Sequence, residues 1–113
     1  MTDCAELIAT YEIDVRFPDV SGMEQLDMLL TRSEIAACET DLTIEQRLRL
    51  AEADKVLLQN VPRFYEAIQN VVDLEAWRRD EKTPITHWWW YLDVLAQLPQ
   101  LPARPVAVET TLA

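Results

Sequence analysis

The stretch SGMEQLDMLLTRSEIAACETDLTIEQ, residues 21–46, contains two helix starts of the same design. In each, a hydroxyl residue is followed three positions later by Glu or Gln: Ser21 by Glu24, and Thr43 by Gln46. In such a capping box, the two side chains satisfy backbone N–H groups that the first turn of a helix leaves free. The stretch therefore predicts two helices joined by a short turn.

Composition supports a helical domain. The chain has 113 residues, half of them apolar, which suits one domain with its own core. Its one glycine is Gly22, whereas hairpins and phosphate-binding loops depend on glycine. We therefore expect a mainly α-helical, compact bundle of four to five helices over residues 1–98, followed by a Pro-rich extended tail at 99–113.

Capping residues, prolines and apolar spacing set the expected helix bounds. The helix after Ser21 should end near Ala37 or Glu39, and the helix after Thr43 near Asn60. Further helices are expected over residues 62–79 and 86–98. The residues predicted to face inward on the first of these helices are Met23, Leu26, Leu29 and Leu30, with Ser33 as an optional fifth. On the second they are Ile44, Leu48, Ala51, Val56 or the stem of Lys55, and Leu58.

Residues 3–17 admit two interpretations. Leu7, Ile8 and Tyr11 have helical spacing, but apolar and charged residues alternate over 11–17 as in a strand. Such a strand would pair with residues 106–112. Because an isolated pair of strands is marginally stable, we favour the helix and keep short strands at the two ends as the alternative.

The chain is strongly acidic. Its formal net charge is −10, and residues 1–60 carry 13 Asp and Glu against 5 Lys and Arg. This charge repels phosphate backbones, so we expect no nucleic-acid partner. A basic protein is the complementary partner, and the acidic first half would steer its approach.

The cysteines and the apolar runs bear on location. Cys4 and Cys38 match no metal or disulfide pattern, so we predict free thiols in a reducing compartment. No apolar run has the length of a membrane span, and the N-terminus lacks the features of a signal peptide. We expect a cytoplasmic protein without membrane contact.

The usual parts of an enzyme are missing from the sequence. There is one histidine, His87, no glycine-rich phosphate loop and no Glu-x-x-His pair. We therefore expect no metal, no cofactor and no catalysis. The alternative is a small α-helical hydrolase or nuclease that uses His87 with a nearby carboxylate, Asp80, Glu81 or Asp93.

Four aromatic residues follow one another at 88–91. Successive side chains on an α-helix are about 100° apart, so the four cannot share one face. The predicted inward stripe consists of Trp88, Tyr91, Leu92 and Leu95. Trp89 and Trp90 then point elsewhere, where either a second layer of this domain or another protein covers them.

We assign five residues to partner binding. Trp89 and Trp90 would supply binding energy, since tryptophan is enriched at interaction hot spots, and Asp93 marks the wetter side of the same helix. Pro102 and Arg104 belong to the tail, whose prolines favour an extended path that a partner can bind.

The expected function is that of a non-enzymatic, acidic protein-interaction module. It would bind and regulate or inhibit a larger basic protein, or be a subunit of a complex. An antitoxin, an inhibitor and an adaptor all fit this description. A homo-oligomer with Trp89 and Trp90 across a two-fold axis is a further option. No motif identifies a family.

Overall fold

The computed structural model describes residues 3–98 of the chain. Over this range it has six α-helices, two 3₁₀ turns and no strand. The elements are α1 (Cys4–Asp14), α2 (Gly22–Ala37), η1 (Glu39–Asp41), α3 (Ile44–Gln59), α4 (Val61–Ile68), α5 (Leu74–Glu81), η2 (Trp88–Tyr91) and α6 (Leu92–Leu95). The mainly helical prediction is confirmed, with six helices rather than four to five.

The alternative of a strand at 11–17 is wrong. Helix α1 continues to Asp14, and residues 15–17 form a turn. Tyr11 and Val15, four positions apart, are both fully buried. Burial of one helical face therefore outweighs the local β propensity of the alternating residues. The expected strand at 106–112 and the tail at 99–113 lie outside the described residues.

Both capping boxes are confirmed. The Ser21 hydroxyl accepts a hydrogen bond from the Glu24 N–H at 3.3 Å, and the Glu24 carboxylate accepts one from the Ser21 N–H at 3.2 Å. The Thr43 hydroxyl and the Gln46 side chain make the same exchange at 3.1 and 2.9 Å. These local bonds fix the starts of α2 and α3.

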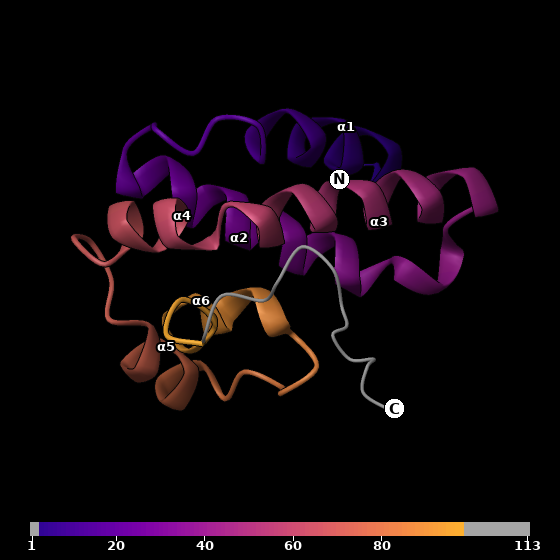
Figure 1. Ribbon diagram of the computed structural model, residues 1–113. Coiled ribbons are helices and arrows are strands. Elements are labelled where there is room, and N and C mark those ends of the chain that lie inside the picture. The colour runs from indigo at the N-terminus through magenta and orange to yellow at the C-terminus, as the bar shows by residue number, and fades with distance from the viewer. Residues whose placement is uncertain (1–2, 99–113) are drawn as a thin grey trace, which may run out of the picture.

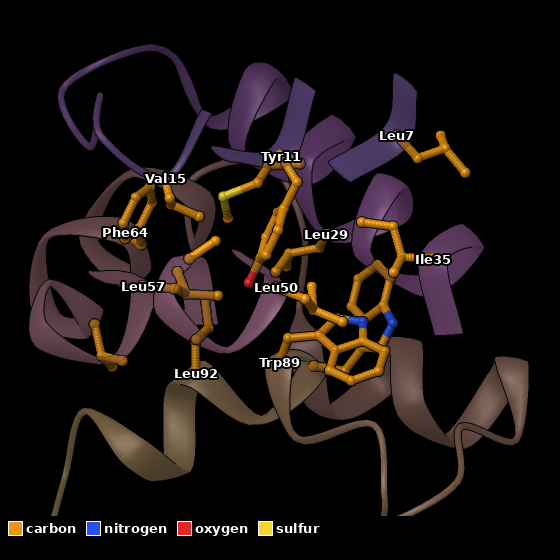
Figure 2. Packing of buried hydrophobic residues seen from close by; sticks show 14 of the residues in the cluster. Leu7, Tyr11, Val15, Leu29, Ile35, Leu50, Leu57, Phe64, Trp89 and Leu92 are labelled. Carbon is orange, nitrogen blue, oxygen red and sulfur yellow. The ribbon is translucent and has the colours of Figure 1, made fainter. Parts of the chain in front are cut away.

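Helices α1 and α2 form an antiparallel hairpin on which the other elements pack. Helix α3 packs against α1, and α4 packs against α2. Helices α5 and α6 lie together on the far side of α4, with η2 between them along the chain (Figure 1). Figure 2 shows Tyr11, Leu29 and Leu57 converging between the helices, with Trp89 entering the same core from η2.

The predicted inward faces of α2 and α3 are wrong in part. Leu29 is buried, but Met23 is 58% exposed, and on α3 Ile44 and Leu48 are 77% and 67% exposed. The buried positions are Gln25, Met28, Leu29, Arg32 and Ile35 on α2, and Leu50, Ala53 and Leu57 on α3. Two of the buried residues of α2, Gln25 and Arg32, are polar. A prediction that uses only the apolar residues therefore selects a different face of this helix.

The third expected helix, over 62–79, is two helices. Helix α4 ends at Ile68, and α5 begins after Asp73, whose carboxylate accepts a hydrogen bond from the Ala76 N–H at 3.1 Å. Asp73 is thus an N-cap in the middle of the expected helix. The break lets α5 turn away from α4 and bring Trp77 toward η2.

Cys4 and Cys38 form a disulfide, so the prediction of free thiols is wrong. The antiparallel hairpin brings the start of α1 to the end of α2, with a Cα–Cα distance of 6.5 Å across a sequence separation of 34. A cytoplasmic location loses its support from the cysteines, because disulfides persist chiefly in oxidising compartments. None of the helices described is long and apolar enough to cross a lipid bilayer.

Candidate functional site

Trp89 and Trp90, the main predicted binding residues, lie in the core. They are 2% and 3% exposed, whereas Trp88 and Tyr91 are half-buried. The predicted stripe assumed an α-helix, but residues 88–91 form a 3₁₀ turn, in which the angle between successive side chains is wider. Of the two alternatives, a second layer of this domain covers the rings, so a partner cannot reach them without opening the core.

Polar and aromatic contacts hold both rings in place. The Ser33 hydroxyl accepts hydrogen bonds from Trp89 Nε1 at 3.0 Å and from Trp90 Nε1 at 2.8 Å. Trp90 also stacks on Trp77 with a centroid distance of 4.9 Å. Both indole N–H groups are therefore satisfied inside the domain, as burial requires.

A buried ion pair lies beside Trp89. Arg32, which is 4% exposed, donates to both carboxylate oxygens of Asp54 at 2.9 and 3.0 Å, and its guanidinium lies 4.2 Å from the Trp89 ring centroid. Tyr11 donates to the same carboxylate at 2.5 Å. Burial, and then the Asp54 charge, raise the pKa of Tyr11, so its hydroxyl stays protonated as the donor. The network joins α1, α2, α3 and η2, which indicates a structural role.

Of the remaining predicted binding residues, the structure describes only Asp93. Asp93 pairs with Arg78, whose Nη1 donates to the carboxylate at 2.7 Å. Pro102 and Arg104 lie outside the described residues. Of the three predicted residues that the structure describes, Trp89 and Trp90 are buried and Asp93 is paired, so these three do not form one exposed surface.

Within the described chain, the histidine that the alternative enzyme needs makes no hydrogen bond or ion pair to an acid, although Glu39 and Asp54 line the same cavity as His87. His87 stacks on Trp89 with a centroid distance of 4.6 Å. No hydrogen bond within residues 3–98 joins it to Asp80, Glu81 or Asp93, so no acid–base pair is assembled there. Over the same residues, no three potential ligands from His, Cys, Asp and Glu converge to hold a metal ion.

A different feature has the properties of a binding surface. A groove of about 970 Å³ runs between α1 and α2. Four carboxylates line it: Asp14 from α1, and Glu24, Asp27 and Glu34 from α2. Among the described residues, no Lys or Arg lines it. We call this surface the acidic groove.

Within the acidic groove, the negative charges of Asp27 and Glu24 act on Asp14. Within the part of the chain that the structure describes, none of the four belongs to an ion pair, although five ion pairs form elsewhere. Partial burial, and then the negative charges of Asp27 and Glu24, raise the pKa of Asp14 above its ordinary value. The groove therefore favours a cationic occupant.

The acidic groove is also apolar. Phe17 and Leu30, which line it together with Val20 and Ala37, are 57% and 39% exposed. Exposed apolar side chains that gather in a concave surface indicate a contact with another molecule. The groove thus offers both hydrophobic contact and negative charge.

Sequence reasoning missed these residues although the signal was present. Glu24, Asp27 and Glu34 are three and seven positions apart, which places them on one face of α2. Leu30, which was predicted to face inward, lies on the same exposed face. The acidic periodicity marks that face, but polar residues at helical spacing are ordinarily read as a solvated surface.

Comparisons of the chain with protein-family models, with curated proteins and with solved structures find no match.

Proposed function

We propose that this chain is a non-enzymatic protein-interaction module that binds a basic partner through the acidic groove. The observation that carries the proposal is that, among the described residues, four carboxylates and no Lys or Arg line that groove. A partner that brings Lys or Arg side chains neutralises these carboxylates. Binding would regulate or inhibit the partner, or make the chain a subunit of its complex.

The acidic groove replaces the tryptophans as the proposed contact surface. The formal net charge of −10 would speed the encounter with a basic protein, and Phe17 and Leu30 would supply the apolar contact that keeps it bound. Pro102 and Arg104 stay a prediction for a second contact in the tail.

Capture from an extract of the native cell, followed by mass spectrometry, tests the function. The full chain is immobilised with its disulfide intact, and bound proteins are eluted by raising the salt concentration. We expect at least one enriched protein to be basic and to elute as charges are screened. The proposal fails if no basic protein is enriched, or if the enriched proteins stay bound when the salt concentration is raised.

A further inference from the structure

We infer that the occupant of the acidic groove is one amphipathic, basic α-helix of the partner. This inference rests on the proposed function and names the binding site and the secondary structure of the bound segment. Helix α2 forms one wall of the groove, and the end of α1 with the loop that follows it forms the other. A further helix laid along α2 packs by the usual ridge-and-groove geometry of helix bundles.

The position of the groove leaves this face open in the described chain. The groove residues Asp27, Leu30 and Glu34 lie on the side of α2 opposite its buried residues, such as Met28 and Arg32. Helix α3 packs on α1 and helix α4 packs on α2 (Figure 1). A third helix on the open side would sandwich the hairpin between two layers.

The length of the groove fits a helix of four turns. On α2 its lining runs from Glu24 to Ala37, which corresponds to about 20 Å at the rise of an α-helix. Asp27 and Glu34 are two turns apart, or about 10 Å. Lysine or arginine residues seven positions apart on a neighbouring helix have the same separation and can meet both carboxylates.

The apolar residues of the groove exclude simpler occupants. Phe17 and Leu30 would gain nothing from a small cation, and no three potential ligands converge on a metal ion over residues 3–98. Phosphate groups are repelled by the carboxylates. A helix with an apolar stripe flanked by cations uses both the charge and the apolar surface, as in known helix-in-groove recognition.

A designed peptide tests the inference directly. The probe is an amphipathic helix of leucine and lysine, about 14 residues long, which matches four turns. The comparison peptide has the same composition with the pattern scrambled. Fluorescence anisotropy at low salt should show clearly tighter binding of the patterned peptide, since only it presents leucine to Phe17 and Leu30 while lysine faces the carboxylates.

Charge variants test whether the peptide binds in the acidic groove. Asp27→Asn with Glu34→Gln should weaken peptide binding about ten-fold, because two partly screened charge contacts are lost. Glu52→Gln with Glu66→Gln is the matched control: it removes the same net charge from exposed positions on α3 and α4, outside the groove. The control should change the affinity by no more than about two-fold.

Apolar variants test the helix itself. Phe17→Ser and, as a second variant, Leu30→Asn should each weaken binding of the patterned peptide but not of the scrambled one. Leu48→Ser, at a side chain 67% exposed on α3, is the control and should have no effect. Thermal unfolding of every variant verifies that the fold is retained.

The outcomes separate this inference from the proposed function. If the two charge pairs weaken binding equally, or if Phe17→Ser and Leu30→Asn have no effect, the groove does not bind a helix. The capture experiment tests the proposed function separately. If the chain captures no basic protein, or only proteins whose binding does not depend on salt, the proposed function fails, whether or not the peptide binds.

Discussion

At the residue scale, the hydroxyl group of Ser33 satisfies two buried indoles. Trp89 Nε1 and Trp90 Nε1 both donate to it, at 3.0 and 2.8 Å. Ser33→Ala leaves both N–H groups buried without an acceptor, and each such group costs about 1–3 kcal/mol. We expect a loss of about 2–4 kcal/mol in the free energy of unfolding, measured by urea denaturation.

Thr31 provides the control for this change. It lies on α2 two positions earlier and lines the acidic groove, as Ser33 does, but no indole N–H within the described residues donates to its hydroxyl. Thr31→Ala removes a hydroxyl of the same kind, and we expect a change within about 0.5 kcal/mol. Equal losses for the two variants would show that the indole contacts of Ser33 contribute little.

Contacts of this kind could not be predicted from the sequence. Ser33 and Trp89 are 56 residues apart, so no local pattern links them. Arg32 is buried against general expectation for arginine, because Asp54 and the Trp89 ring compensate its charge. The aromatic run at 88–91 indicated burial correctly, but which of its members face the core depends on a 3₁₀ turn.

At the element scale, local chemistry was predictable and packing was not. The Ser21 and Thr43 capping boxes set the starts of α2 and α3, because each depends on residues three positions apart. The buried face of α3 was not predictable, because Leu50 and Leu57 share it with the small Ala53 while Ile44 and Leu48 stay exposed. Only the position of α1 decides between these faces.

Gly22, the one glycine of the chain, marks a close helix contact. A Cβ atom there would press on the backbone carbonyl oxygen of Ala67 in α4 and approach a methyl group of Val71 at 3.0 Å. Helix propensity favours alanine by about 1 kcal/mol, but backbone crowding of this kind costs about 1–3 kcal/mol. We expect Gly22→Ala to lower the melting temperature. A rise, as propensity alone predicts, would show that α2 and α4 are further apart.

The disulfide closes the open end of the α1–α2 hairpin. Cross-linking residues 34 apart removes chain entropy worth about 3–4 kcal/mol from the unfolded state. Cys4→Ser with Cys38→Ser should lower the free energy of unfolding by roughly this amount. The measurement is urea denaturation of the variant beside the oxidised and the reduced wild type.

The reduced wild type is the control for the serine side chains. It should match the double variant, and titration of free thiols should find two only after reduction. If reduction changes neither the thiol titration nor the stability, Cys4 and Cys38 are not bonded in solution.

At the scale of the whole molecule, the acidic composition predicted a basic partner but not the surface that would meet it. Five carboxylates of the described chain are neutralised by arginines that join elements or lie at the surface, such as Glu12 by Arg49. The carboxylates of the acidic groove are not neutralised. Net charge is a property of the sequence, whereas its distribution depends on which side of α2 faces the core.

Asp14 makes the stability of the folded domain depend on pH. Its pKa in the folded domain is raised by burial, by Asp27 and by Glu24. The protonated form is therefore favoured by folding: the stabilising contribution is complete below the unfolded pKa of about 3.9 and is lost as pH rises through the higher folded value. At neutral pH, the ionised carboxylate of Asp14 therefore lowers the free energy of unfolding.

Asp14→Asn removes this repulsion and should stabilise the domain at neutral pH. We expect a gain of about 0.5 kcal/mol, as for relieved like-charge contacts at a surface. The gain should vanish in acid, where the wild-type carboxyl is protonated. Urea denaturation at the two pH values measures it, and Glu52→Gln, outside the groove, should show no comparable difference.

The same substitution should weaken binding of the leucine–lysine peptide, because the groove loses a charge that a cationic partner neutralises. For the wild type, binding should tighten as pH rises through the pKa of Asp14, since the peptide favours the ionised form. A variant that is more stable but binds less well shows that the repulsion serves binding. If Asp14→Asn changes neither stability nor affinity, the carboxylates of the groove do not act on one another.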